Sequence, residues 1–255
     1  MGEPEAAQAG REGRGSSLTR HLRWEGCFNA RDLGGLPTRN GRETRWRAMV
    51  RADALDGLTA AGWETLWSYG VRTVVDLRND DEVGTDAAPR PAGVTTLRIP
   101  LDGIEHREFW DIWQAGPQFG TPLYYRPHLE CFPERSAAVV RAIARAGPGA
   151  VVFHCGGGRD RAGQVAMLML AIVGVPATAI AADYDLSGER GRARCAARGE
   201  PDQGPQLAAF LAERGTTAAE VIRRTLAELD VEGCLREGGL EDQDVAALRR
   251  RLVGP

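Results

Sequence analysis

The chain contains no lysine: all 32 of its basic residues are arginines, set against 35 acidic residues, and the formal net charge is −3. Abundant alanine and glycine accompany this arginine usage, which is typical of GC-rich coding rather than of the tuning of one site. The arginines are scattered along the chain instead of being massed in one stretch. A small negative charge without a basic run argues against a nucleic-acid-binding protein.

Long apolar runs, paired cysteines and clustered histidines are missing as well. No stretch approaches the roughly 20 apolar residues of a membrane helix, and the start of the chain lacks the apolar core of a signal peptide. The five cysteines form no C-x-x-C pair, which favours a reducing compartment. The four histidines lie far apart, so we expect no metal site. These absences predict a cytoplasmic protein without a cofactor, preceded by a disordered tail at 1–20.

One segment, 154–163, carries most of the chemical information and reads H-C-G-G-G-R-D-R-A-G. The apolar run 150–154 predicts a buried strand before it, and the apolar run 164–173 predicts a helix after it. Three consecutive glycines allow the loop to curl so that successive N–H groups point inward and form an anion site. A loop between the end of a strand and the start of a helix is where α/β folds bind anions.

Three residues of this loop have the chemistry of phosphoryl transfer. Arg161 returns to the centre of the loop and can hold two phosphate oxygens with its planar guanidinium group. Cys155 faces the N–H donors and the start of the helix, and we expect both to favour its thiolate form. His154 is expected to orient the loop by hydrogen bonds, with a merely buried histidine as the alternative. A thiolate at the base of a phosphate-binding loop is a phosphoryl acceptor.

Other glycine-rich loops fit these residues less well. A nucleotide P-loop requires G-x-x-x-x-G-K-[ST], and neither the lysine nor the hydroxyl residue is present. A dinucleotide-binding turn has another glycine spacing and gives Cys155 no role. A rhodanese-type loop also holds a cysteine in an anion site, but it does not require Arg161. We therefore favour phosphate-ester hydrolysis, and sulfur transfer from a persulfide on Cys155 remains an alternative.

The loop resembles the H-C-x5-R motif of cysteine-dependent phosphatases. More narrowly, it resembles the H-C-x-x-G-K-D-R-[TS]-G form of atypical bacterial tyrosine phosphatases of the PtpB type, which also act on lipid phosphates. Four further segments resemble motifs of this family, so that the similarity covers roughly residues 24–250. These segments are 28–35 (F-N-A-R-D-L-G-G), 50–55 (V-R-A-D-A-L), 74–78 (V-V-D-L-R) and 183–187 (D-Y-D-L-S).

The sequence departs from the family motif at two positions. Arg159 replaces the family lysine and keeps the charge, although its planar group is shaped differently from an ammonium group. Ala162 replaces a serine or threonine whose hydroxyl, in related enzymes, assists hydrolysis of the phosphoenzyme. We therefore expect slow breakdown of the intermediate in this protein.

The resemblance also implies roles for the remaining loop residues. Cys155 is the nucleophile, Arg161 stabilises charge on the transferred phosphoryl group, and Asp160 is the general acid. Asp102 and Asp111 are upstream alternatives for the acid, as in phosphatases whose acid lies on a separate loop. The residues expected to bind the phosphate of the substrate are Gly156, Gly157, Gly158 and Arg159.

We predict a single α/β phosphatase domain over 21–255, with a central, mostly parallel sheet flanked by helices. A chain of 255 residues with 43% hydrophobic content can form one substantial core and hardly two. The predicted strands are 46–51, 71–77, 94–99 and 151–154. The predicted helices are 59–69, 133–146, 163–173, 176–187, 207–214, 218–229 and 242–252.

Residues 101–132 form an insertion between a predicted strand and a predicted helix, and they carry a large share of the aromatic side chains. The pattern predicts either a helical insertion packed on the core or a lid over the phosphate site. Enzymes of the PtpB type carry helical lids, so the resemblance supports the lid as much as the packed insertion. The aromatic residues are Phe109, Trp110, Trp113, Phe119, Tyr124, Tyr125 and Phe132.

These features predict a protein tyrosine phosphatase, with dual-specificity or phosphoinositide activity left open. Its partners would be phosphotyrosine proteins or phosphoinositides, and neither nucleic acid nor an integral membrane segment is expected. The loop does not distinguish these substrates, because all of them present the same phosphomonoester group. The alternative is a phosphate-binding pseudo-phosphatase that recognises a phosphorylated partner without efficient turnover. Ala162 favours that alternative, whereas the intact Cys155, Asp160 and Arg161 argue against it.

Overall fold

A computed structural model describes residues 19–254 of the chain. The tail predicted to be disordered, 1–20, therefore lies outside the described residues except for its last two. Of these two, Arg20 donates a hydrogen bond from Nε to the Asp32 carbonyl oxygen at 3.0 Å, and its guanidinium group pairs with Asp183. The described part of the chain thus begins at a side chain anchored to the domain.

Within residues 19–254, five strands form one sheet in the order β1-β2-β5-β3-β4. All neighbouring pairs are parallel except β1 and β2, which are antiparallel. This arrangement confirms the predicted mostly parallel α/β sheet. The edge strand β1 was not predicted, because two residues are too short for an alternating pattern. The strands are β1 (Arg31–Asp32), β2 (Met49–Ala52), β3 (Val71–Asp76), β4 (Thr95–Arg98) and β5 (Ala150–His154).

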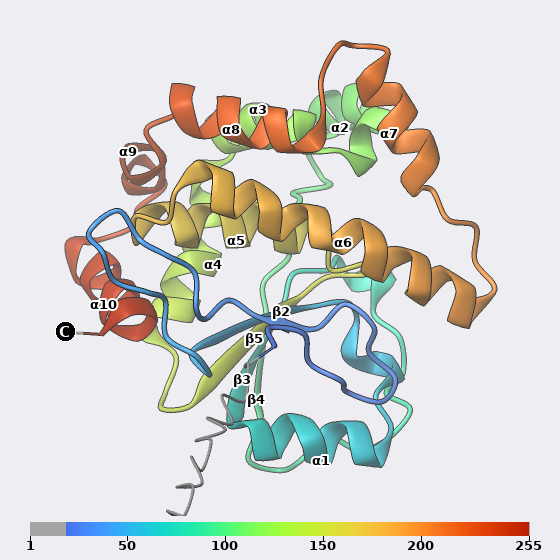
Figure 1. Cartoon of the computed structure of the whole chain (residues 1–255), viewed down its shortest axis with the longest axis vertical. Helices are drawn as coiled ribbons and strands as arrows, with labels where there is room; N and C mark the ends of the chain where they lie inside the picture. Colours follow the sequence, from blue (N-terminus) through green and yellow to red (C-terminus); the bar gives the residue numbers. More distant parts are fainter. Residues whose placement is uncertain (1–18, 255) are drawn as a thin grey trace, which may run out of the picture.

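Side chains of the central strands alternate between two apolar layers, as expected from the period of a strand. In β5, Val151 and Phe153 belong to the larger layer, whereas Val152 belongs to the smaller one. Helix α1 covers the smaller layer, and α4 and α5 cover the larger one on the opposite face of the sheet (Figure 1). These helices and α10, which packs on α4, are α1 (Ala60–Tyr69), α4 (Pro133–Arg145), α5 (Arg161–Ile172) and α10 (Asp242–Val253).

The chain after residue 160 is mainly helical. The helix predicted at 176–187 is too short: α6 continues to Arg198 and ends at Gly199, whose φ of 65° is left-handed. Gly188 and Gly191 weaken the helical pattern without interrupting the helix. None of the described helices is long and apolar enough to cross a membrane, and the cytoplasmic location stays a prediction. The other helices here are α6 (Ala177–Arg198), α7 (Gly204–Ala212), α8 (Ala218–Glu228) and the unpredicted α9 (Val231–Glu237).

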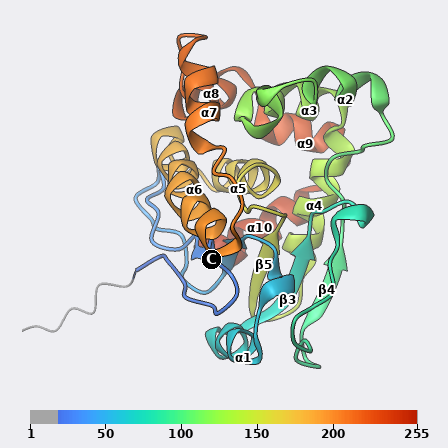
Figure 2. The ribbon, with the colours of Figure 1, turned by 90° about the vertical axis from the view of Figure 1, so that its right-hand side faces the viewer.

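The aromatic insertion is folded onto the larger core layer. It contains α2 (Arg107–Trp113) and α3 (Tyr125–Cys131), which lie at the same end of the molecule as α7 and α8 (Figure 2). Trp110, Tyr124 and Tyr125 are fully buried in that layer. The structure therefore favours the packed insertion, and movement of this segment as a lid stays a prediction.

Candidate active site

The catalytic loop, residues 155–160, joins β5 to α5 at the edge of the sheet where the parallel strands end. The last residue of β5, His154, pairs with Ala52 at the end of β2 and with Asp76 at the end of β3. The segments that follow these two strands therefore run beside the loop. Cys155 begins the loop and is 2% exposed, so the thiol lies at its base rather than on the surface.

Five consecutive carbonyl oxygens of the catalytic loop accept hydrogen bonds from the surrounding framework. The donors are four residues from three separate segments, and they lie between 2.6 and 3.1 Å from the carbonyl oxygens. Because the carbonyl groups are engaged from outside, the N–H groups of the loop are available on its inner side, as an anion site requires. The donors are the Ala54 amide for Gly156, Asn29 for Gly157, Arg51 for Gly158 and Arg159, and the Tyr125 hydroxyl for Asp160.

A buried ion network holds Arg51 in place beneath the loop. Asp183 on α6 accepts hydrogen bonds from Arg51 at 2.8 Å and from Arg31 at 3.1 Å, and all three side chains are at most 1% exposed. Burial raises the pKa of Asp183, but Arg31, Arg51 and Arg20 outweigh burial and hold that pKa far below its ordinary value. The motifs at 28–35, 50–55 and 183–187 therefore meet in one network that supports the loop.

Two glycines are required by close approaches at the loop. Gly158 has a φ of 67°, and a Cβ atom there would lie 2.6 Å from the backbone of Ala52. Gly163, in the first turn of α5, faces two aromatic side chains: a Cβ atom would lie 2.6 Å from the Tyr125 hydroxyl and 3.0 Å from the Tyr184 ring. Larger residues at either position would displace the loop or the aromatic side chains around it.

Arg161, the first residue of α5, is held by two carboxylates. Its guanidinium group forms a bidentate contact with the Glu82 carboxylate, in which Nη2 lies 2.5 Å from Oε1. The same group lies 3.2 Å from Asp102 Oδ2. Burial raises the pKa of Glu82, but hydrogen bonding and the charge of Arg161 outweigh it and lower that pKa below its ordinary value. The planar group that the sequence assigns to phosphate is therefore paired with a planar anion in this structure.

Asp102 is the deeper of these two carboxylates. Its side chain is 5% exposed and accepts a hydrogen bond from Asn79 Nδ2 at 3.0 Å. Burial raises the pKa of Asp102, with Glu82 and Asp160 adding to the effect and Arg161 opposing it. A cavity of about 400 Å³ opens beside Arg161 between the segment after β3 and the aromatic insertion. Its lining includes Asp102 and the exposed Asp111, so both upstream acid candidates border the same cavity.

Asp160 points to the other side of the loop, toward α6. Its carboxylate lies 3.2 Å from Arg159 Nε and accepts a 3.4 Å hydrogen bond from the Tyr184 hydroxyl. Burial raises the pKa of Tyr184 above its ordinary value, with Asp160 adding to the effect, so this hydroxyl stays a proton donor. The structure therefore separates the candidate acids: Asp160 lies on the α6 side and Asp102 on the insertion side.

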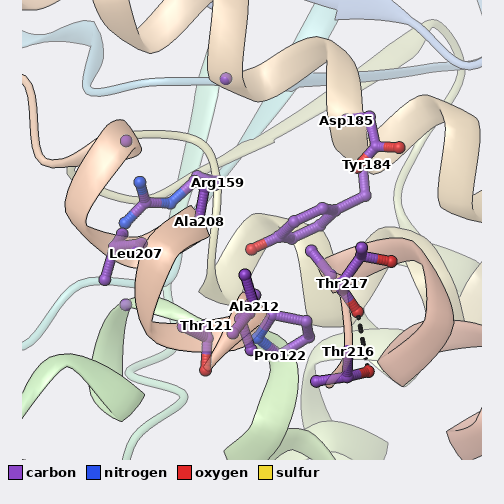
Figure 3. Close-up of a pocket in the computed structure, with 15 residues that line it drawn as sticks. Thr121, Pro122, Arg159, Tyr184, Asp185, Leu207, Ala208, Ala212, Thr216 and Thr217 are labelled. Atoms are coloured by element: carbon purple, nitrogen blue, oxygen red, sulfur yellow. Dashed lines mark hydrogen bonds between the residues drawn. The ribbon is translucent and has the colours of Figure 1, made fainter. Parts of the chain in front are cut away.

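Arg159 and Tyr184 also border an apolar cavity of about 280 Å³. Figure 3 shows the Tyr184 ring extending toward Pro122 and Ala212, with Arg159 beside Leu207 on α7. A polar cavity of about 390 Å³ lies on another side of Arg159 and is also bordered by Asp160. The residue that replaces the family lysine is thus placed where it can contact parts of a substrate beyond the phosphate group.

His154 is fully buried directly before Cys155. Burial lowers its pKa to about 4, so the imidazole is neutral near pH 7. Its Nδ1 lies 3.4 Å from the Cys155 carbonyl oxygen, and its Nε2 lies 3.7 Å from Asp76 Oδ2. These contacts suit a supporting role for the backbone at Cys155, and none of them places the imidazole in a proton-transfer position.

The sequence missed Glu82, Arg51 and Tyr125 as parts of this site. Only position could have indicated Glu82: it follows the predicted strand 71–77, whose carboxyl end meets the same sheet edge as the loop. The described residues contain no group of His, Cys, Asp and Glu able to hold a metal ion. That the protein works without a cofactor stays a prediction.

Ala162 is fully buried as the second residue of α5.

Comparison with known proteins adds an independent observation. Residues 22–254 match the sequence model of the tyrosine phosphatase family. The match includes the sheet, the catalytic loop, the aromatic insertion and the helices that follow them, so it covers nearly all of the described chain.

Individual relatives agree with this match. The triple specificity protein phosphatase PtpB of Mycobacterium tuberculosis is 27% identical over 279 residues, covering 90% of this chain and 98% of that protein. A tyrosine-protein phosphatase of Nostoc commune is 29% identical over 218 residues, with coverages of 80% and 74%. A Cupriavidus necator protein named as a candidate tyrosine-protein phosphatase is 32% identical over 175 residues, which are 66% of this chain but only 63% of that relative.

Proposed function

Because the chain belongs to the tyrosine phosphatase family, we propose that it hydrolyses phosphomonoesters through a phosphocysteine intermediate. The observation that carries this proposal is the loop with five outward-bonded carbonyl oxygens, Cys155 at its base and Arg161 at the start of α5. Such a loop offers inward N–H groups, a guanidinium group and a nucleophile around one phosphate-sized centre.

In the first step, the Cys155 thiolate attacks phosphorus and forms an S–P bond while the bond to the leaving oxygen breaks. The leaving oxygen takes a proton from a carboxylic acid, which we assign to Asp160. Arg161 and the loop N–H groups hold the three non-bridging oxygens, over which the charge of the transition state is spread. To do so, Arg161 exchanges Glu82 for the phosphate group.

In the second step, the same carboxylate accepts a proton from water as the water oxygen attacks phosphorus. The S–P bond breaks, the thiolate of Cys155 is restored, and inorganic phosphate leaves. Ala162 offers no hydroxyl group to stabilise the departing sulfur, so this step is expected to be the slower one.

Two positions compete for the role of acid. Asp160 belongs to the loop, and its contact with the Tyr184 hydroxyl supports it in a fixed orientation. Asp102 has the raised pKa that a proton donor needs and lies 3.2 Å from Arg161. Both carboxylates lie 3.2 Å from an arginine nitrogen, so this contact does not distinguish them. We retain Asp160 because it is part of the loop itself and because the resemblance assigns the acid to this position.

The nucleophile is tested by Cys155→Ser, with Cys131→Ser as the matched control, because Cys131 is an exposed cysteine far along the chain from the loop. We expect Cys155→Ser to release no phosphate from nitrophenyl phosphate and to retain phosphate binding, because a serine hydroxyl is not ionised near neutral pH. Acid quenching of the native enzyme during turnover should trap a phosphoryl group on the peptide containing Cys155. Substantial activity in Cys155→Ser would refute the covalent mechanism.

The substrate class is proposed to include phosphotyrosine, with phosphoserine, phosphothreonine and phosphoinositides as further candidates. The name of the Mycobacterium tuberculosis relative describes more than one specificity for that protein, which supports testing the same breadth here. Rates with one phosphotyrosine peptide, one phosphoserine peptide and one phosphoinositide at equal concentration would rank them. Activity on the phosphoserine peptide alone would contradict the tyrosine assignment.

A second candidate function is recognition of a phosphorylated partner without efficient turnover. Ala162 favours it, because the absence of a hydroxyl group at this position is expected to slow hydrolysis of the phosphocysteine. Binding of a phosphotyrosine peptide by the native protein, without phosphate release over many enzyme equivalents, would support this function over hydrolysis.

A further inference from the structure

A groove of about 580 Å³ lies at the end of the sheet opposite the catalytic loop. It is formed by the segment before β2, by the turn before β5 and by the last turn of α10, which lies beside that turn in Figure 1. Four of its lining residues are arginines, and none of the lining residues is acidic. We call it the arginine groove, after Arg45, Arg47, Arg250 and Arg251.

Residues 19–254 supply no carboxylate partner for the charge of the arginine groove. Arginines on neighbouring surfaces have carboxylate partners: Arg249 pairs with Glu232 at 2.8 Å, and Arg145 pairs with Asp244 at 2.6 Å. Among the ion pairs formed within residues 19–254, none involves the four arginines of the groove. Two of them act on each other instead: burial lowers the pKa of Arg251, and the charge of Arg45 lowers it further.

Part of the arginine groove has a purely structural explanation. Arg250 and Arg251 lie in the last turn of α10, where cations interact favourably with the helix dipole. Arg251 donates hydrogen bonds to the carbonyl oxygens of Gly147 and Gly149, each at 3.0 Å, and so holds the turn before β5. Its Nε is buried without a hydrogen-bond partner, so one donor of this guanidinium group is left over.

Arg45 and Arg47 come from a different segment of the chain. Arg45 donates to the Arg250 carbonyl oxygen at 3.4 Å, and the Arg47 guanidinium group lies 5.1 Å from the centre of the Tyr69 ring. Neither contact supplies a carboxylate partner for these two charges. Arg47 has a φ of 58°, a left-handed conformation that arginine rarely adopts, and its amide donates to Asp32 Oδ2 at 2.8 Å. Backbone strain of this kind persists where the surrounding structure imposes it, and it is frequent at binding sites. Here it belongs to a segment that brings two further cations to a groove already lined by Arg250 and Arg251.

We propose that the arginine groove binds a ligand carrying two or more phosphate groups. Planar guanidinium groups match phosphate oxygens two at a time, and several of them around one groove suit a compact anion of high charge. The groove is large enough for more than one phosphate group with part of the molecule that bears them. The groove lies at the end of the strands opposite Cys155, so a ligand can occupy the groove while the catalytic loop remains free.

The test compares two adjacent arginines of α10 that differ in environment. Arg250→Gln removes a charge from the groove, whereas Arg249→Gln removes the same charge from a residue paired with Glu232. We expect Arg250→Gln to weaken tripolyphosphate binding, measured by calorimetry on the full chain, by about fivefold, as for loss of one charge-assisted contact. Arg249→Gln should change the affinity by less than about twofold, because its charge is already neutralised.

Two further measurements complete the test. Both variants should hydrolyse nitrophenyl phosphate at the native rate, which shows that they are folded and separates the groove from the catalytic loop. Free tripolyphosphate and phosphatidylcholine vesicles containing a bisphosphorylated inositol lipid distinguish a soluble ligand from a lipid headgroup, and Arg250-dependent binding of either one supports the proposal. Equal binding by the native protein and both variants, or no binding of either probe, would overturn it.

Discussion

The catalytic loop has two flanks that are built differently. On the anchored flank, Arg31, Arg51 and Asp183 are at most 1% exposed, and Arg51 donates hydrogen bonds to two carbonyl oxygens of the loop. On the open flank, Glu82 is 33% exposed and Arg161 is 11% exposed, and their contact borders a cavity. Both flanks pair arginine with carboxylate, yet only one pair is within reach of water and substrate.

This difference in burial separates permanent contacts from exchangeable ones. Removing one partner of a buried ion pair leaves the other charge buried without solvation. Every alternative arrangement of the anchored flank is therefore much higher in free energy. On the open flank, a phosphate group can replace the carboxylate of Glu82. A planar carboxylate and a tetrahedral phosphate group can each accept two hydrogen bonds from one guanidinium group. The loop backbone is therefore preorganised, while Arg161, the residue proposed to bind phosphate, is free to change its partner.

The largest effect on turnover is expected from replacing the residue that supplies the proton, and this substitution shows on which flank that residue lies. Asp160→Asn is expected to lower turnover of alkyl phosphates by about 10²–10⁴-fold, the usual contribution of a general acid. Nitrophenyl phosphate should be affected least, because nitrophenolate leaves without a proton. Turnover of both esters by Asp160→Asn, measured across the pH range, checks this expectation, and the basic limb of the profile should flatten.

Asp102→Asn and Asp111→Asn provide the comparison for the open flank. Asp111 is exposed on α2, and its replacement should leave turnover within about twofold, as for a surface substitution. Asp102→Asn should raise the KM by disturbing Arg161, with similar losses for both esters. If Asp102→Asn instead reproduces the dependence on the leaving group and Asp160→Asn does not, the acid lies on the open flank.

The anchored flank should respond next most strongly, through stability. Asp183→Asn is expected to lower the free energy of unfolding by about 3–5 kcal/mol, because it leaves Arg31 and Arg51 buried without an anion. Urea unfolding at neutral pH measures this loss. The matched control is Asp185→Asn, two residues along the same helix and outside the ion network, which should change the free energy by less than about 1 kcal/mol. Equal effects would mean that the network contributes little.

The contribution of His128 to stability should decrease in acid, because this buried histidine supports the backbone of Asp102 on the open flank. His128 donates from Nε2 to the Asp102 carbonyl oxygen at 3.2 Å and accepts at Nδ1 from Gln164 at 3.0 Å, since a carbonyl oxygen can only accept. Burial lowers the pKa of His128 from 6.5 to about 4. Between these values the unfolded chain binds the proton more readily, so the stabilisation is complete above pH 6.5 and is lost as the pH falls toward 4.

The expected loss from His128 over this range is on the order of 3 kcal/mol. Urea unfolding at several pH values for the native protein and for His128→Gln isolates this contribution, because other titrating groups are common to both proteins. The difference in stability between the two should shrink as the pH falls. A difference that stays constant from pH 7 to pH 4 would show that His128 has no such linkage.

A smaller effect should follow from removing the competitor of phosphate on the open flank. Glu82→Gln is expected to lower the KM for phosphate esters by about threefold to tenfold, equivalent to the modest free energy of a partly exposed ion pair. Asp81→Asn, an exposed neighbour bordering the same cavity, removes the same charge without touching Arg161 and should change the KM little. A KM that rises in Glu82→Gln would instead identify Glu82 as a group that positions Arg161.

The smallest effect concerns the missing hydroxyl group at the junction of the two flanks. Ala162→Ser is expected to raise turnover by about twofold to tenfold if hydrolysis of the phosphocysteine is limiting. Serine is chosen over threonine because Ala162 is fully buried and an added methyl group would overpack the core. Rapid mixing should show a burst of product in the native enzyme and a weaker burst in the variant. Identical traces would mean that the hydroxyl group has no role here.

Local patterns predicted the elements that carry the chemistry. The apolar run 150–154, the glycine-rich loop and the apolar run after it are each short and continuous, so their order as strand, loop and helix could be read directly. The length of α6 could not be read, because Gly188 and Gly191 lower helix propensity while packing against α8 keeps this long helix intact. Helix α9 escaped prediction because seven residues give too little periodicity.

By itself, the sequence determined which groups are proposed to attack and bind phosphate, because the spacing of Cys155 and Arg161 around three glycines needs no distant residue to be recognised. Only the tertiary structure decided how the loop is held and what occupies its arginine. Arg51, Tyr125 and Glu82 lie 30 or more positions from the loop along the chain. Arg51 belongs to a family-like segment and Tyr125 to the aromatic insertion, but neither pattern predicts a hydrogen bond to the loop backbone. They meet the loop because parallel strands end at one edge of the sheet, which makes residues from separate crossovers neighbours in space.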